Sequence, residues 1–132
     1  MTISDDAPVP DDVPLFHRVH PVHIVWDDDR RCQKVSSGLF RHPEMSVDLG
    51  DKLEELGVTP DSLVDAFSDH ALVVLFAGAA RECKQEIVRQ PLPSLPAHGL
   101  IVGKKTQGVQ RALARASEWV VRPDDACDPP YP

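Results

Sequence analysis

The sequence predicts an α+β fold with a mixed β-sheet of about four to six strands, and three observations support this class. Short apolar runs alternate with turn residues, as expected for strands in 45–49 and 71–77. Two short amphipathic segments between residues 51 and 67 predict a helical pair in the middle of the chain. Residues 107–120 carry apolar side chains at i, i+4, i+7 and i+11, which predicts a C-terminal amphipathic helix packed on the sheet.

The N-terminal part of the domain predicts a β-hairpin. Residues 15–26 are rich in apolar and β-branched side chains, and Pro21 divides them into two short strands or one bent edge strand. Residues 27–30 form a polar turn, after which residues 32–36 predict the returning strand.

In the middle of the chain, the strand predicted at 45–49 leads into a helical turn at 51–56 that ends at Gly57. Thr59 is the expected N-cap of a second helix over 59–67, with Pro60 in its first turn. The uninterrupted apolar run 71–77 predicts a central strand covered on both faces.

Two further strands are predicted before the final helix. Residues 86–90 and 98–102 have strand composition, and the proline-rich segment 91–96 between them predicts an extended connector.

The chain of 132 residues is expected to form one domain, over 15–121, between two tails. Residues 1–14 contain four aspartates and no cation, and residues 122–132 are also acidic and proline-rich. Because neither segment offers much apolar surface to bury, both are predicted to be disordered.

The three cysteines show no metal-binding or disulfide spacing, so reduced thiols and a cytoplasmic location are expected. The longest apolar run is too short to cross a bilayer. A net charge of −7 disfavours general binding to nucleic acids or anionic membranes, because like charges repel.

The predicted junction between strand 98–102 and helix 107–120 is the main candidate binding site. A helix N-terminus attracts anions, and here it is preceded by two lysines and a threonine cap. The candidate ligand-binding residues at and around this junction are Arg81, His98, Gly103, Lys104, Lys105, Thr106 and Arg111.

Three histidines, His17, His20 and His23, are spaced three residues apart. On a straight strand the middle ring faces away from the other two, so the sequence predicts no metal site.

Four polar residues occur in an order that resembles the ADP-ribosyltransferases, in which an early arginine is followed by a serine-containing strand and a late glutamate. The corresponding residues are Arg18, Ser36, Ser37 and Glu86. The resemblance implies catalytic roles for them and NAD as a cofactor; otherwise no cofactor is expected.

Our leading sequence-based hypothesis is a small binding or accessory domain that recognises a protein partner or a phosphate-bearing ligand through the cationic junction. One alternative is a small enzyme that uses NAD. A second alternative is an immunity or inhibitor protein whose acidic tails cover a basic target. The sequence leaves open whether the chain is an enzyme.

Overall fold

The computed structural model describes residues 2–132 and confirms the α+β class. The strands are β1 (Pro14–Val19), β2 (Ile24–Asp27), β3 (Cys32–Val35), β4 (Glu44–Leu49), β5 (Ala71–Phe76), β6 (Glu86–Arg89), β7 (His98–Val102) and β8 (Glu118–Val121). The helices are α1 (Gly50–Leu56), α2 (Ala77–Glu82) and α3 (Gln107–Ala116), with 3-10 turns η1 (Pro21–His23), η2 (Ser37–Phe40) and η3 (Pro60–Val64).

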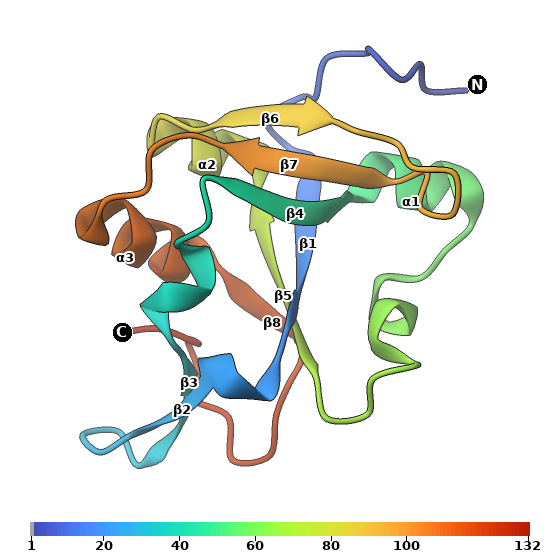
Figure 1. The fold of residues 1–132 in the computed structure, drawn as a ribbon. Coiled ribbons are helices and arrows are strands. Elements are labelled where there is room, and N and C mark those ends of the chain that lie inside the picture. The colour runs from blue at the N-terminus through green and yellow to red at the C-terminus, as the bar shows by residue number, and fades with distance from the viewer. Residues whose placement is uncertain (1) are drawn as a thin grey trace.

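Six of these strands form one sheet in the order β6-β7-β4-β1-β5-β8, while β2 and β3 form a separate hairpin. Each neighbouring pair in the large sheet is antiparallel, whereas the sequence predicted a mixed sheet. In Figure 1 strands β6, β7 and β4 run across the view and β1, β5 and β8 run down it, so the sheet is strongly twisted.

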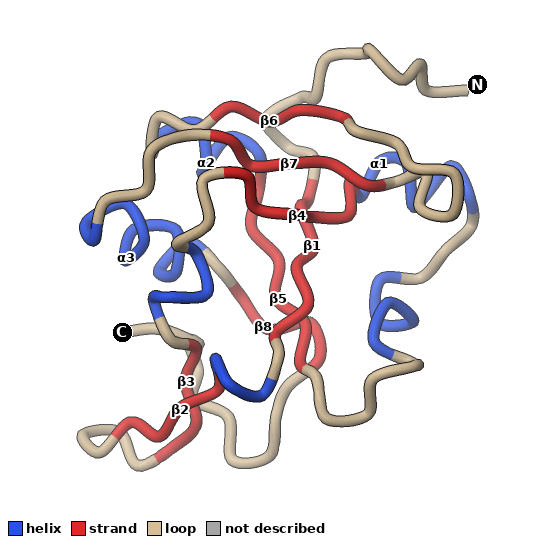
Figure 2. Tube along the Cα trace, in the orientation of Figure 1, coloured by secondary structure: helices blue, strands red, loops and turns tan. Residues whose placement is uncertain are grey.

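Helices cover both faces of the sheet, as Figure 2 shows with helices and strands in different colours. On one face α2, α3 and η2 enclose the main core, to which β1 contributes Leu15 and Val19. On the other face α1 and η3 cover a smaller core, to which β1 contributes Phe16. The alternation of side chains along a strand places these residues on opposite faces.

Three predicted elements differ from those observed. The C-terminal helix packs on the sheet as predicted, but it ends at Ala116 because Ser117 has an extended backbone and its hydroxyl donates to the Ala114 carbonyl at 2.7 Å. The following residues form β8, which pairs with β5, so β5 lies next to the edge rather than at the centre. The segment predicted as a helix over 59–67 forms the shorter turn η3, and Thr59 makes no side-chain cap.

Both terminal segments pack against the domain, in contrast to the disordered tails that the sequence predicted; Met1 lies outside the described residues. Val9 and Val13 are buried in the main core. Backbone carbonyls of the N-terminal segment accept hydrogen bonds from two arginines, Arg81 and Arg89. The contacts that hold this segment are therefore polar as well as apolar, and composition alone does not reveal them.

The prediction of three reduced thiols is wrong, because Cys32 and Cys127 form a disulfide across 95 positions of sequence. Cys83 is a free thiol. The two bonded cysteines come together because the C-terminal segment runs beside β3, where Gln33 and Cys127 are hydrogen-bonded through their backbones at 2.7 Å.

Within residues 2–132, every helix is too short or too polar to span a membrane.

Candidate functional site

The main opening in the sheet lies between β1 and β4. These strands pair only at Leu15 with Leu49 and at Phe16 with Asp48, whereas β1 pairs with β5 along its whole length. Beyond this short ladder β1 and β4 diverge. We call the gap between residues 17–19 and 44–47 the β1–β4 seam; two cavities open on it, and both are lined by His17, Arg18 and Ser46.

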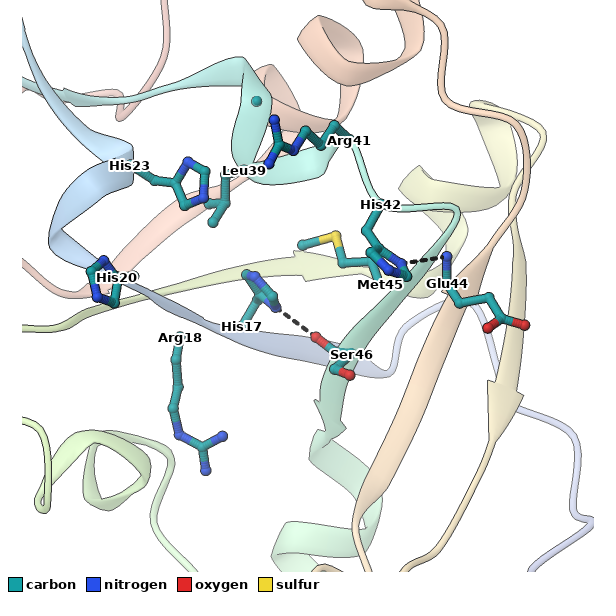
Figure 3. A pocket seen from close by; sticks show the side chains of 11 residues that line it. His17, Arg18, His20, His23, Leu39, Arg41, His42, Glu44, Met45 and Ser46 are labelled. Atoms are coloured by element: carbon teal, nitrogen blue, oxygen red, sulfur yellow. Dashed lines mark hydrogen bonds between the residues drawn. The ribbon is translucent and has the colours of Figure 1, made fainter.

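His17 bridges the seam through its Nδ1, which lies 2.5 Å from the Ser46 carbonyl oxygen (Figure 3). Because a carbonyl only accepts, Nδ1 carries the proton and donates. Burial lowers the pKa of His17 to about 4, against the opposing effect of the Ser46 hydrogen bond, and the charges of His23 and Arg18 lower it further. His17 is therefore neutral at physiological pH.

The larger cavity, of about 430 Å³, is the histidine pocket. Its lining residues are His17, Arg18, His20, His23, Gly38, Leu39, Arg41, His42, Glu44, Met45 and Ser46. They come from β1, from η1 and its N-cap His20, from η2 and β4, and from the loop between η2 and β4. Figure 3 shows His17 and Arg18 leaving β1 in opposite directions, so Arg41 is the guanidinium on the histidine side.

Backbone hydrogen bonds fix the tautomers of two of these histidines. The Glu44 N–H donates to His42 Nδ1 at 3.0 Å, and the Val22 N–H donates to His20 Nδ1 at 3.1 Å. In its neutral form each ring therefore carries its proton on Nε2. Both imidazoles keep an N–H donor for a further acceptor.

His23 links the histidines electrostatically to Arg41. Burial lowers the pKa of His23, and the positive charges of Arg41 and His20 lower it further. A negative charge placed among these three groups would have the opposite effect on that pKa.

The second cavity, of about 80 Å³, lies on the other face of the sheet. Arg18 there donates through Nε to the Leu63 carbonyl at 2.7 Å, and its Nη1 lies 3.8 Å from Asp48 Oδ2. Burial raises the pKa of the Asp48 carboxyl, while Arg18 and His98 oppose that shift. We call this the Asp48 cavity; it brings together two sequence-predicted candidates, Arg18 and His98.

Most residues of the strand-to-helix junction use their polar groups in hydrogen bonds within the fold. Lys105 is buried, and its ammonium donates to the carbonyls of Pro43, Ile101 and Gly103 at 3.1, 2.8 and 3.3 Å. Thr106 is the N-cap of α3 as predicted, accepting from the Val109 N–H at 3.2 Å.

Gly103 at this junction has φ +156°, and a Cβ there would lie 2.6 Å from Gln85 Oε1. The position needs glycine to let the buried Gln85 side chain reach the Lys104 carbonyl, to which it donates at 3.1 Å.

Lys104 is exposed and, with Thr106, lines a cavity of about 370 Å³ between α2 and the start of α3. Arg111 is exposed on α3. His98 begins β7 and the junction follows its end, so the structure does not bring His98 to the lysines.

The remaining candidates lie apart from the seam. Arg81 pairs with Asp11 at 2.6 Å. Ser36 caps η2 by accepting from the Gly38 N–H, and Ser37 begins that turn. Glu86 begins β6, which β7 and β4 separate from β1, so the structure does not bring it to Arg18.

Sequence reasoning missed the contribution of β4 to both cavities. The alternation of 45–49 predicts that Ser46 and Asp48 share a face, and they do line the Asp48 cavity. The sequence indicated only that a serine and an aspartate share one face of this strand; it did not indicate which strands pair with it. Nothing in the sequence indicated that Arg41 and His42 line a cavity, because their positions depend on how η2 packs in the fold.

Among residues 2–132, no three histidine, cysteine, aspartate or glutamate side chains are arranged to hold a metal ion. Comparisons with protein-family models, curated proteins and solved structures found no match to the chain.

Proposed function

We propose that this protein binds a small phosphate-bearing ligand in the histidine pocket. One observation carries the proposal: four imidazoles and the Arg41 guanidinium line a single cavity whose one carboxylate is Glu44, in a chain of net charge −7. A phosphate-bearing ligand was also expected from the sequence, but at the strand-to-helix junction. We place it in the histidine pocket instead, because the Lys105 ammonium at the junction donates to backbone carbonyls.

The donors of the pocket suit phosphate oxygens. His20 and His42 each keep an Nε2–H in the neutral form, because a backbone N–H occupies the other ring nitrogen. Arg41 adds a guanidinium, which binds phosphate in a fork of two hydrogen bonds. These groups bind an anion even at pH values where the imidazoles are uncharged.

The charge of the whole molecule favours a small ligand over a polymer. A net charge of −7 repels an extended polyanion such as a nucleic acid, since every phosphate along it meets the same field. A single phosphate group meets mainly the charges that line its own cavity.

His23 should make phosphate binding depend on pH. Burial and the positive charge of Arg41 lower the pKa of His23, which disfavours the protonated ring in the free protein. A bound phosphate favours the protonated ring, so affinity should rise more from pH 8 to pH 6 in the wild type than in His23→Gln, and the titration of the phosphate itself cancels in that comparison.

The proposal is tested by titrating the protein with inorganic phosphate and with AMP, using calorimetry at pH 6 and pH 8. Arg41→Gln should weaken binding about 10- to 150-fold, because a hydrogen bond to a charged group contributes roughly 1.5–3 kcal/mol. Arg111→Gln, which changes an exposed arginine on α3, is the matched control and should leave affinity unchanged.

Two results would overturn the proposal. Binding that is lost in Lys104→Gln and kept in Arg41→Gln would place the ligand at the junction cavity instead. No binding of either compound at millimolar concentration would leave recognition of a protein partner as the better hypothesis.

A further inference from the structure

We propose that Ser46 and His98 form a nucleophile and general-base pair, in the Asp48 cavity, that acts on short-chain acyl esters. The inference does not depend on the proposed phosphate binding: Ser46 lines both cavities, but the pair is formed by its hydroxyl with His98, which lines only the Asp48 cavity. Its basis is a chain of two hydrogen bonds that runs from the Ser46 hydroxyl through the His98 ring to a backbone carbonyl.

The two hydrogen bonds define the direction of proton transfer. His98 Nδ1 lies 2.9 Å from the Gln90 carbonyl oxygen, and His98 Nε2 lies 3.2 Å from Ser46 Oγ. A carbonyl only accepts, so Nδ1 carries the ring proton and Nε2 of the neutral ring is a bare acceptor. The Ser46 hydroxyl therefore donates to Nε2, as a serine nucleophile does to its base.

The sheet register holds this pair in place. Asp48 and His98 are direct partners between β4 and β7, and Ser46 lies two residues from Asp48 on the same face. The Gln90 carbonyl accepts from His98 Nδ1 and so orients the base, which is the role of the third residue in a catalytic triad. The partner of Nε2 is therefore on strand β4, and the partner of Nδ1 directly follows β6, where the Gln90 N–H also donates to the His98 carbonyl at 3.0 Å.

Charges around the cavity suit the reaction. The Asp48 carboxylate lies opposite His98 and would stabilise the imidazolium that forms when Ser46 loses its proton. Arg18 lines the same cavity and supplies positive charge for the oxyanion of a tetrahedral intermediate. Ser46 is exposed, so a substrate can reach its hydroxyl.

The reaction has two steps. Ser46 Oγ attacks the ester carbonyl carbon while its proton passes to His98 Nε2; the C–O bond to the alcohol then breaks, and the alcohol leaves with that proton. Water next attacks the acyl-serine, His98 takes a proton from it, and the released serine oxygen regains a proton from the imidazolium. A cavity of about 80 Å³ restricts the acyl group to one of a few carbons.

A fluorophosphonate probe tests the pair, because an activated serine displaces its fluoride and keeps the phosphonyl group. Intact mass spectrometry of the full chain should show one added group, and peptide mapping should place it on Ser46. His98→Gln should slow the labelling about 10²- to 10⁴-fold, the usual contribution of a general base. Ser46→Ala should abolish it.

Ser62→Ala is the matched control, because the Ser62 hydroxyl donates to the Thr59 carbonyl at 2.6 Å and should not react. This variant should be labelled like the wild type. Absence of labelling, labelling at another residue, or labelling of Ser46 at an unchanged rate in His98→Gln would overturn the proposal. Should His98→Gln fail to fold, Asp48→Asn replaces it, and an unchanged labelling rate there would count against the pair.

Discussion

Lys105 is the residue whose role differs most from its sequence-based interpretation. A lysine beside a helix N-terminus looks like a ligand for an anion, yet this ammonium is buried and donates to three backbone carbonyls. Those carbonyls belong to the end of β7 and to the loop before β4. Burial lowers the pKa of Lys105, as expected for a charge with little access to water.

Replacing Lys105 with methionine should therefore destabilise the protein. The variant keeps an apolar side chain of similar length but removes the three hydrogen bonds of the buried ammonium, although the Pro43 carbonyl still accepts from the Gly103 N–H, so we expect a loss of about 2–4 kcal/mol in the free energy of unfolding. Urea denaturation at pH 7 measures it. Lys104→Gln, at an exposed site one residue away, should change stability by less than about 0.5 kcal/mol; equal effects at both positions would contradict this role.

His17 should make stability depend on pH. Its pKa is about 4 in the folded protein and near 6.5 in the unfolded chain, so below pH 6.5 the unfolded state binds more protons. The stability that His17 contributes is complete above pH 6.5 and is lost as the pH falls through 4. Between pH 7 and pH 5 the wild type should lose about 1–2 kcal/mol more than His17→Gln.

The measurement for His17 is urea denaturation of both proteins across this pH range. Other groups that titrate, such as Asp48, are present in both proteins and cancel in the difference. Parallel stability curves for the two proteins would contradict the prediction.

At the scale of elements, Arg89 joins α1, β6 and the N-terminal segment. Its guanidinium pairs with both Asp51 oxygens on α1, and Nε donates to the Ala7 carbonyl at 2.9 Å. The Arg89 side chain is only 6% exposed. The same hydrogen bonds lower the pKa of Asp51 despite its partial burial.

Arg89→Met should release the N-terminal segment. We expect a loss of about 3–5 kcal/mol, the usual cost of removing one partner of a buried pair, and faster hydrogen exchange in residues 2–13 than elsewhere. Arg122→Gln breaks an exposed pair with Asp128 and should have little effect. If hydrogen exchange in Arg89→Met became faster by the same factor along the whole chain, Arg89 would contribute only to global stability.

The elements also show what the sequence could and could not predict. The helix 51–56 and the strands 45–49, 86–90 and 98–102 were predicted because their patterns and end signals are local. Residues 118–120 were assigned to the helix, since Val120 continues its apolar stripe; the formation of a strand there depends on pairing with β5.

The candidate site was harder to predict for the same reason. His98 and Arg18 were named from the sequence, but the seam exists because β1 and β4 pair over only two positions. Strand register and the docking of η2 are long-range properties. A single sequence therefore identified polar residues of the site without indicating which of them meet.

At the scale of the whole molecule, the Cys32–Cys127 disulfide closes the chain from the β2–β3 hairpin to the C-terminal segment. Three backbone hydrogen bonds accompany it, including Val35 N–H to the Pro130 carbonyl at 3.0 Å. Trp119 Nε1 donates to the Cys127 carbonyl at 2.6 Å, which connects β8 to the same segment. Disulfides are typical of oxidising compartments, so the thiol argument for a cytoplasmic location no longer holds.

Breaking this bond should free the C-terminal segment before the domain unfolds. The variant Cys32→Ser with Cys127→Ser should lose about 2–4 kcal/mol, because a cross-link between distant positions restricts the unfolded chain. In a Trp26→Phe background, which leaves Trp119 as the one tryptophan, fluorescence should shift to the red in native buffer as the contact of Trp119 with Cys127 loosens. Cys83→Ser, which removes the free thiol, should match the wild type in both measurements. Titration of the non-reduced wild type with a thiol reagent should find one reactive group per chain after denaturation, and three would contradict the disulfide.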